Sequence, residues 1–361
     1  MNRTEKPLAF QPGAFDVFTG MDTSKKSIAM TFIDDAGEIK NVKMAYNPQA
    51  VVSFVQRRYP GKRVAFAYEA GPTGYGLYDE LTKSGFHCMV VSPGLVPKKP
   101  GNHVKTDRID GETLSVSLRG GQIQSIQIPM GDYRNLRHLI QLRDTYVKQL
   151  AGNKTRIKSL LLFHGISFPG SQTTEQWSCS VMTALRTLPC DEHIKFHIDQ
   201  LLDLITFQRT KVLEVTRHIR KLCKGNEEIQ HNIQLLSTIS GIGFITASQV
   251  IACIGDTKIL RHCDQLAGYF GLAPKEHSSG EATRRGSITR AGNPRMRTKL
   301  IQCAWAAIRT DQELKAVYTK ILTRNHGAGG PNKAIVAVAR RLATRIYAVL
   351  TQQRPYVLRN I

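Results

Sequence analysis

From Phe15 onward, short runs of apolar and polar residues have the pattern of β-strands. Residues 15–22, 27–33 and 39–46 each form such a run, and the turn sequence Asp34-Asp35-Ala36-Gly37 separates the second run from the third. These three runs predict neighbouring antiparallel strands.

Helix and strand patterns then follow one another. A helix is predicted to begin at Pro48, because proline is favoured in the first turn of a helix and apolar residues then recur on one side. Residues 64–68 form an apolar run typical of a buried strand, and the next elements are a helix at 75–84, a strand at 88–91 and a helix from about Asp107. The whole series predicts an α/β sheet with three antiparallel strands and a parallel remainder, which is the strand order of ribonuclease-H-like folds.

Residues 131–228 change to a helical pattern. Apolar residues recur there at steps of three and four, as in a heptad seam, at Leu136, Leu139, Tyr146, Leu150, Ile157 and Leu160 and again at Ile198, Leu201, Ile205, Val212, Val215, Ile219 and Leu222. The two series predict two long helices, separated by a loop-rich insert at 168–190. Such helices form either a hairpin that packs on itself or an arm that joins subunits, and the periodicity is compatible with both.

The remainder of the chain is predicted to be mainly helical. Residues 235–247 follow the pattern helix, glycine turn, helix, which predicts a helix-hairpin-helix motif. Gly241 and Gly243 in this turn would let backbone N–H groups approach a phosphate, although an ordinary corner between helices has the same sequence. The predicted domains are a flexible lead-in at 1–14, a sheet domain at 15–130, a helical region with its insert at 131–228 and a basic helical domain at 229–361.

Basic residues outnumber acidic ones by a wide margin. The chain has 50 Lys and Arg against 28 Asp and Glu, a formal net charge of +22. Such a surplus is typical of proteins that bind nucleic acid, although a merely basic soluble protein or one that binds anionic membranes has the same balance.

The spacing of the cysteines and the length of the apolar segments indicate the cellular compartment in which the protein acts. Seven scattered cysteines without a Cys-x-x-Cys pair indicate neither a zinc site nor a disulfide framework, which fits a reducing cytoplasm. The sequence has neither a signal-peptide pattern nor an apolar run long enough to span a bilayer. We therefore expect no membrane partner and a cytoplasmic bacterial protein that is nucleoid-associated when it acts.

Four acidic residues stand where the predicted fold would bring them together. Asp22 lies at the end of the first strand, Glu69 follows the buried strand 64–68, and Asp107 and Asp110 lie three residues apart on one face of a helix. Carboxylates at short range raise each other's pKa unless cations neutralise them, and hard divalent ions such as Mg²⁺ or Mn²⁺ prefer oxygen ligands. The four residues therefore predict a metal site of the kind that catalyses phosphoryl displacement.

Each acid also has a simpler explanation. Asp22 could cap a turn with Ser24, Glu69 could be a loop charge, and Asp107 or Asp110 could cap the helix N-terminus. The combination is more specific than its members, because placement on two strands and a helix has to coincide. Flanking cations at Lys25, Lys26, Lys105 and Arg108 would suit an anionic substrate.

A serine segment precedes a strongly basic run. Ser278 and Ser279 stand before Gly280, and glycine gives an adjacent nucleophile backbone freedom and exposure, although most Ser-Ser-Gly triplets are plain turns. Basic residues that could contact and neutralise a phosphodiester follow at Arg284, Arg285, Arg290, Arg295, Arg297 and Lys299.

These motifs together resemble the transposases of insertion-sequence family 110, including its 1111 branch, and the related Piv-type DNA invertases. The resemblance is carried by residues 20–25, by Tyr68-Glu69-Ala70-Gly71 with the segment 105–110, and by residues 239–243, 271–274 and 278–280 with the run to Arg297. It covers roughly residues 15–310. The sequence departs from the family pattern at Gly111, where the family often has alanine, and at Glu281, where a second glycine is common.

The resemblance implies a RuvC-like domain with an Asp-Glu-Asp-Asp metal site, formed here by Asp22, Glu69, Asp107 and Asp110 with Mg²⁺ or Mn²⁺. It implies a transposase domain whose serine, best matched by Ser279 and next by Ser278, joins covalently to DNA. It also implies a bridge RNA that pairs with donor and target DNA. The protein would act as a homo-oligomer, a dimer or tetramer, in which one subunit's serine completes another's metal site.

Three other functions remain open at this stage. A RuvC-like Holliday-junction nuclease would use the same metal site to hydrolyse DNA without a covalent step. A sugar-kinase or actin-type ATPase would use residues 22–25 as a phosphate loop, but the sequence lacks the second Gly-rich loop of that fold. A binding protein without catalysis would leave the four acids without a purpose, since unpaired acids weaken binding to phosphates.

Overall fold

The computed structural model describes residues 10–96, 107–169, 177–255, 262–279, 282–324, 327 and 329–358. The chain divides into two compact units, Met1–Ile128 and Pro129–Ile361, which we call the sheet unit and the helical unit. Each unit is described by itself. None of the helices within the described ranges combines the length and the apolar character needed to cross a membrane.

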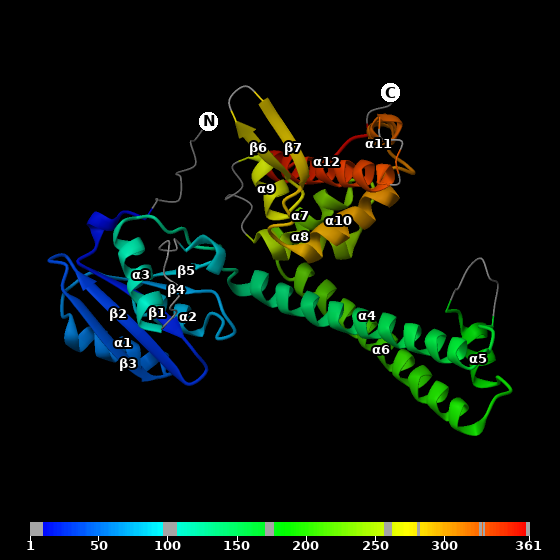
Figure 1. The fold of residues 1–361 in the computed structure, drawn as a ribbon, viewed down its shortest axis with the longest axis horizontal. Helices are drawn as coiled ribbons and strands as arrows, with labels where there is room; N and C mark the ends of the chain where they lie inside the picture. Colours follow the sequence, from blue (N-terminus) through cyan, green and yellow to red (C-terminus); the bar gives the residue numbers. More distant parts are fainter. Residues whose placement is uncertain are drawn as a thin grey trace. The chain divides into compact units, whose positions relative to one another are not determined.

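The sheet unit contains five strands in the order β3-β2-β1-β4-β5 (Figure 1). The strands are β1 (Val17–Thr23), β2 (Ser27–Asp34), β3 (Ile39–Ala45), β4 (Val64–Glu69) and β5 (His87–Val91). β1, β2 and β3 pair antiparallel, whereas β4 pairs parallel with both β1 and β5. The prediction of an α/β sheet followed by a mostly helical region is confirmed, and the strand order is compatible with a ribonuclease-H-like fold.

Helices cover both faces of this sheet because its central strands are apolar on both sides. One face packs against α1 (Pro48–Arg58) and α2 (Gly76–Lys83), with Val17, Met21, Phe66 and Tyr68 among the buried strand residues. The intervening strand residues, Phe18, Ala65, Ala67 and Met89, pack with α3 (Asp107–Arg119) on the other face. α1 begins at Pro48 as predicted, and the side chain of Asn47 caps it by accepting the backbone N–H of Ala50. Short 3₁₀ turns at Pro12–Ala14 and Pro93–Leu95 complete the unit.

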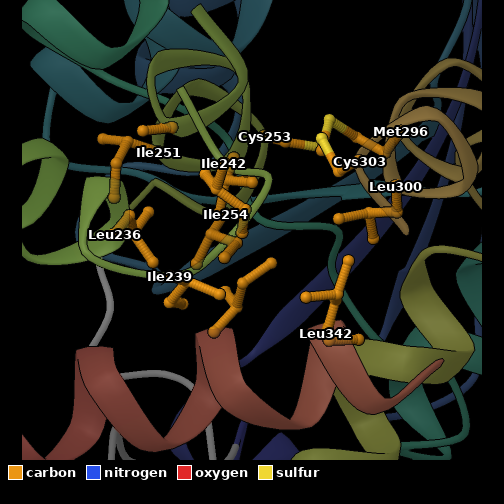
Figure 2. Close-up of a cluster of buried hydrophobic side chains, with 14 of the residues drawn as sticks. Leu236, Ile239, Ile242, Ile251, Cys253, Ile254, Met296, Leu300, Cys303 and Leu342 are labelled. Carbon is orange, nitrogen blue, oxygen red and sulfur yellow. The ribbon is translucent and has the colours of Figure 1, made fainter. Parts of the chain in front are cut away.

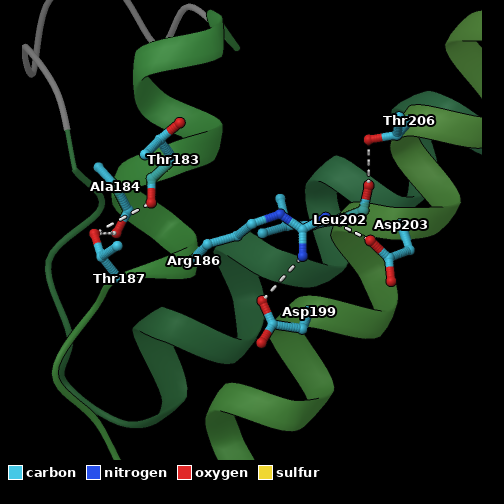
Figure 3. A network of polar contacts seen from close by, with 8 residues as sticks. All are labelled: Thr183, Ala184, Arg186, Thr187, Asp199, Leu202, Asp203 and Thr206. Carbon is cyan, nitrogen blue, oxygen red and sulfur yellow. Dashed lines mark hydrogen bonds and ion pairs between the residues drawn. The ribbon is translucent and has the colours of Figure 1, made fainter.

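The helical unit begins with two long helices, α4 (Gly131–Phe163) and α6 (Glu192–Lys224), which we call the arm. They run side by side in opposite directions, since Arg143 contacts Thr216 whereas Asn153 contacts Gln208 (Figure 1). The predicted loop-rich insert between them was wrong in part, because it contains the helix α5 (Cys179–Arg186). Figure 3 shows how Arg186 fixes α5 to the arm, where it pairs with both Asp199 and Asp203 of α6.

In the part of the helical unit that the structure describes, six further helices surround an extensive hydrophobic core. They are α7 (Glu227–Ser237), α8 (Phe244–Ile254), α9 (Cys263–Tyr269), α10 (Pro294–Ala307), α11 (Gln312–Arg324) and α12 (Gly330–Gln352). Leu236, Ile251, Leu300 and Leu342, from four different helices, meet in this core (Figure 2). α8 is buried along most of its length, which explains its nearly continuous apolar sequence.

A β-hairpin interrupts the helices of this unit. Strand β6 (Pro274–Ser279) pairs antiparallel with β7 (Ala282–Ile288) and forms a separate two-stranded sheet. The sequence pattern predicted a mainly helical domain here and did not predict the hairpin. The structure places Ser279, the predicted nucleophile, at the end of a strand.

The end of the chain is tied to the helical unit by a buried ion pair. The Arg345 guanidinium on α12 pairs with Asp311, which is 1% exposed, and with Glu313 at 2.9 Å. The central carbon of this guanidinium lies over the ring of Tyr356, 4.6 Å from the ring centroid. The Tyr356 backbone N–H donates to the hydroxyl oxygen of Thr238. α12 and the segment around Tyr356 therefore pack against the rest of the helical unit.

Candidate active site

Asp22 and Glu69 lie on neighbouring strands at the same edge of the sheet. In the parallel register of β1 and β4, Gly20 is opposite Ala67 and Met21 is opposite Tyr68, so the next residues along are Asp22 and Glu69. Side chains alternate between faces along a strand, and Ala65 and Ala67 belong to the face covered by α3. Asp22 and Glu69 therefore share the α3 face, on strands whose usual separation is about 4.8 Å.

α3 approaches β1 so closely that no side chain fits between the two backbones. A Cβ atom on Gly20 would lie 2.1 Å from the carbonyl oxygen of Gly111 and 2.7 Å from the backbone nitrogen of Ser115. The Ser115 hydroxyl accepts the Gly20 N–H at 2.7 Å and lies 2.7 Å from the carbonyl oxygen of Thr31 on β2. This small-residue contact fixes the height of α3 above the sheet.

The same contact brings the first turn of α3 to the edge where β1 ends. Leu114 and Leu118, later in the helix, pack with Phe18 near the start of β1, while Gly111 meets Gly20 further along. The helix thus runs antiparallel to the strand, and Asp110 and Asp107 precede Gly111 toward the end that carries Asp22. Asp107 is the first residue of α3, and its side chain lies outside the described part of the structure, as does the flanking Lys105.

The chemistry of this edge is that of an oxygen-donor site. Asp22, Glu69 and Asp110 are half-buried, and Asp22 and Asp110 each take part in a polar interaction. The carboxylate oxygens of these three acids do not all lie within 4.8 Å of one another. Among the described side chains, the possible ligand atoms of His262, Cys263 and Asp264 do lie within that distance of each other. Carboxylates are the ligands that hard divalent cations prefer, so the residue types fit Mg²⁺ or Mn²⁺.

A hydroxyl pair joins the end of β1 to the loop that follows β4. Thr23, directly after Asp22, has its hydroxyl oxygen 2.9 Å from that of Thr73, which lies in the loop after Glu69. The Ala70 N–H in the same loop donates to the Val91 carbonyl at the end of β5. These bonds hold the backbone that follows Glu69 and so restrict where its carboxylate can lie.

The predicted nucleophile lies in the other unit. Ser279 is the last residue of β6 and is opposite Ala282 in β7, while Ser278 is opposite Thr283. Arg284 and Arg285 are the partners of His277 and Glu276 in the same ladder. The side chains of these strand residues, and the whole of Gly280 and Glu281, lie outside the described part of the structure.

The remaining predicted nucleic-acid contacts lie around the N-terminus of α10. Arg290 and Arg295 are exposed, whereas the half-buried Arg297 donates to the Arg290 carbonyl at 3.2 Å and Lys299 donates to Gln302. Arg290 adopts a positive φ of 56°, a backbone conformation that is uncommon for a residue other than glycine. The structure gives Arg297 a role in holding this turn, whereas the other three have no such backbone role in the described contacts.

The two predicted phosphate-binding glycines differ in their surroundings. Gly241 has φ +83°, and a Cβ there would lie 2.4 Å from the carbonyl oxygen of Cys303 on α10, so packing alone explains this glycine. Gly243 is exposed, has open space where a Cβ would be, and caps the start of α8 without a side-chain hydrogen bond. Of the two, Gly243 is therefore the one whose backbone a phosphate could approach.

Comparisons with known proteins cover both units. The DEDD transposase family of the IS110 group matches residues 19–166, and the family described as Transposase IS116/IS110/IS902 matches residues 233–319. The protein y4qE of Sinorhizobium fredii, named as a transposase, is 32% identical over 294 residues, which are 80% of this chain and 71% of the relative. The chain belongs to the IS110 family of transposases.

Further relatives extend the range of this transposase family. The transposase for the insertion sequence element IS1111A of Coxiella burnetii is 25% identical over 344 residues, 93% of this chain and 90% of the relative. The pilin gene-inverting protein of Moraxella bovis is 30% identical over 166 residues, 45% of this chain and 50% of the relative. The predicted family is thus confirmed, and this IS110-family transposase is an enzyme of DNA recombination.

Sequence reasoning missed the residues that position α3 in this transposase. Gly20, Gly111 and Ser115 hold α3 against the sheet, and none of them was predicted to have a role at the site. A signal was present, because Gly111 and Ser115 stand four residues apart and so form a strip of small residues on one face of a helix. Without the fold, nothing indicated that this strip would meet a glycine almost one hundred residues earlier.

Proposed function

We propose that this IS110-family transposase cleaves and rejoins DNA through a covalent link between Ser279 and the DNA backbone. Asp22, Glu69, Asp107 and Asp110 would form its metal-binding acidic site, within a RuvC-like domain. The observation that carries the proposal is the shared edge of β1 and β4, where Asp22 and Glu69 are adjacent in register on the face that α3 covers. An acidic edge in a chain with a net charge of +22 would oppose DNA binding unless cations occupied it.

The four acids would hold Mg²⁺ or Mn²⁺, with Asp22 and Glu69 contributed by strands and Asp107 and Asp110 by the first turn of α3. When bound, such ions stabilise the negative charge that develops on a phosphate during displacement. The Gly20–Ser115 contact would keep α3, and hence Asp110, at a constant distance from the sheet. Positioning of this kind matters because misplacing a catalytic group by about 1 Å can cost roughly 100-fold in rate.

Ser279 would supply the nucleophile. Its Oγ forms a bond to phosphorus, the bond from phosphorus to the leaving strand's oxygen breaks, and the serine proton is transferred so that the leaving strand ends in a hydroxyl. One strand end then remains esterified to the serine. Attack on this ester by the hydroxyl of a second DNA strand reverses the chemistry and rejoins the DNA without an external energy source.

The nucleic-acid partners and the assembly follow from the same proposal. Donor and target DNA would contact the basic residues near the hairpin, which are Arg284, Arg285, Arg290, Arg295, Arg297 and Lys299, together with the open backbone at Gly243. A helix-hairpin-helix arrangement of α7 and α8 suits this phosphate contact. A bridge RNA would pair with both DNAs, and a dimer or tetramer would let the serine of one copy act with the acids of another, in the cytoplasm at the nucleoid.

A denaturing gel with end-labelled DNA tests the covalent step. The wild-type transposase with Mg²⁺ should leave labelled DNA attached to protein, and Ser279→Ala and Asp22→Asn should not. Ser278→Ala is the matched control and should retain the adduct. If the adduct survives in Ser279→Ala and disappears in Ser278→Ala, the assignment moves by one residue.

The same gel separates the alternative of a Holliday-junction nuclease. A hydrolytic enzyme would cut DNA in the Ser279→Ala variant and would form no adduct in the wild type, because water is then the nucleophile. Cutting that depends on Asp22 but not on either serine would therefore overturn the covalent proposal while leaving the acidic site in place.

A further inference from the structure

The hairpin that carries Ser279 is joined to the helical unit by two short segments of chain. β6 and β7 form a sheet of their own, and Figure 1 shows them projecting from the helices of this unit. A two-stranded hairpin is marginally stable by itself in water. The direction of the hairpin therefore depends on its base, which consists of residues 269–273 before β6 (the entry segment) and residues 289–293 after β7 (the exit segment).

The entry and exit segments lie with their backbones in contact. The Thr289 N–H donates to the Ala273 carbonyl at 2.8 Å, and the Asn293 N–H donates to the Tyr269 carbonyl at 2.9 Å. Between these two bonds, Gly292 has a φ of +93°, and a Cβ there would lie 2.3 Å from the Tyr269 carbonyl oxygen. The two segments are therefore packed as closely as backbones allow, and they move as one body.

Arg297, near the N-terminus of α10, contacts both segments with its guanidinium. Its Nη1 donates to the Arg290 carbonyl oxygen of the exit segment at 3.2 Å. The same nitrogen lies so close to Gly271 of the entry segment that a Cβ there would be 2.3 Å from it. Arg290 has a φ of 56°, an uncommon conformation that persists only where the surroundings hold it. On either side of Arg297, the α10 residues Met296 and Leu300 are buried in the core, so this side chain connects the core to the base of the hairpin.

We propose that Arg297 is a positioning residue for Ser279, because it fixes the base of the hairpin to α10. The inference rests on the proposed function in taking Ser279 as the nucleophile. β6 has six residues, and at about 3.3 Å per residue it places Ser279 about 20 Å from the base. Over that length a tilt of about 3° at the base moves the end of the strand by about 1 Å, and a displacement of this size can cost roughly 100-fold in rate.

The variant Arg297→Lys separates positioning from DNA binding in the full chain. Lysine keeps the positive charge, so a phosphate contact made by this residue would remain. A flexible stem with a single ammonium replaces the rigid planar group that spans the two segments. The rate of covalent adduct formation is measured at saturating labelled DNA with Mg²⁺, and the affinity for the same DNA is measured over a range of salt concentrations. Arg309→Lys, at an exposed position beyond the end of α10, is the matched control.

The expected result for Arg297→Lys is a rate about 100-fold lower at saturating DNA, with the affinity and its salt dependence unchanged. The control Arg309→Lys should keep the wild-type rate. A wild-type rate in Arg297→Lys overturns the proposal. A loss of affinity as large as the loss of rate also overturns it, because Arg297 would then act by binding DNA and not by positioning the hairpin.

Hydrogen–deuterium exchange tests the same contact without catalysis. In Arg297→Lys, peptides that cover β6 and β7 should exchange faster, while those of α10 and α12 keep the wild-type exchange and the thermal unfolding midpoint does not change. Faster exchange throughout the helical unit would make Arg297 a general structural residue and overturn the proposal. If the wild type forms no adduct, the covalent proposal fails, whereas the exchange of the hairpin still decides whether Arg297 holds it.

Discussion

The α3–β1 contact and the α4–α6 arm both pack a helix against a partner, but they do so at different distances. In the sheet unit, Gly20 and Gly111 bring two backbones together, and Ser115 bonds to backbone atoms of both β1 and β2. In the arm, side chains separate the helices, and Gly152 of α4 has open space where a Cβ would be. Glycine is thus required for packing in one region and only weakens a helix in the other.

The difference follows from what each region has to hold. The sheet unit carries the acids of the proposed site, and a backbone contact fixes their elements with little freedom to shift. The arm is a long seam of apolar side chains, which can adjust to small changes of volume. Its register depends instead on a buried polar pair, Asn153 and Gln208, whose amides bond to each other at 3.2 Å.

The largest expected effect comes from adding a methyl group to the backbone contact. Gly20→Ala would put a Cβ 2.1 Å from the Gly111 carbonyl oxygen, and because the neighbours are backbone atoms they cannot move without displacing α3 or β1. We expect a loss of more than about 4 kcal/mol, beyond the usual cost of overpacking, together with loss of DNA cleavage. Urea unfolding followed by circular dichroism measures it.

Fluorescence shows whether the damage is confined to the sheet unit. The chain has 2 tryptophans, Trp177 and Trp305, and both belong to the helical unit. In Gly20→Ala the circular dichroism transition of the sheet unit should move to lower urea, while the tryptophan transition stays in place. Equal shifts of both signals would contradict the view that the contact stabilises the sheet unit alone.

A smaller effect is expected from removing the hydroxyl at the same contact. Ser115→Ala leaves the buried Gly20 N–H without its acceptor, which should cost about 1–3 kcal/mol. Thermal unfolding measures the loss, with the exposed Ser53→Ala on α1 as a control that should change stability by less than about 0.5 kcal/mol. A neutral Ser115→Ala would mean that the close approach of Gly20 and Gly111 suffices to hold α3.

The sheet and its helices could be predicted because their signals are local. A short strand-like run gave the strand that contains Asp22, a continuous apolar run gave the strand before Glu69, and Pro48 marked the start of α1. The parallel order of β1 and β4 follows from the crossover between them. The contact of Gly20 with Gly111 could not be predicted, because it joins residues that are far apart in the sequence. Nothing in either local sequence specifies the partner.

The hairpin around Ser279 was missed for a different reason. Lys275-Glu276-His277-Ser278-Ser279 is polar throughout, so it lacks the apolar alternation that indicates a strand. The useful signal was the two-residue spacer Gly280-Glu281 between the polar runs, since a Gly-x pair is typical of tight hairpins. Ser279 and the four acids belong to different units, and no local sequence pattern relates one unit to the other.

In the arm, removing one member of the buried pair Asn153 and Gln208 should lower the free energy of unfolding more than replacing both members. Asn153→Leu alone leaves the Gln208 amide buried without its partner and should cost about 1–2 kcal/mol. Replacing both residues with leucine should recover most of that loss, because no unpaired amide remains. Trp177, at the arm, reports the transition by fluorescence. Arg156 also donates to the Asn153 Oδ1, so a double variant that is less stable than either single variant would show that this second bond contributes as well.

The smallest expected change in the free energy of unfolding is an increase, whereas the other variants lower it. Gly152→Ala makes the same chemical change as Gly20→Ala, but at a mid-helix position of α4 where nothing lies within 4 Å of the added Cβ. Alanine lowers the conformational entropy of the unfolded chain and favours the helix, so stability should rise by about 0.5–1 kcal/mol. Tryptophan fluorescence during urea unfolding measures this at a protein concentration low enough to keep the chain monomeric.

Repeating the measurement at high concentration sharpens the comparison, because the open face at Gly152 is available to a second copy. A gain at low concentration that turns into a loss at high concentration would mean that another chain packs closely there, and glycine in the arm would then serve the same purpose as Gly20 in the sheet unit.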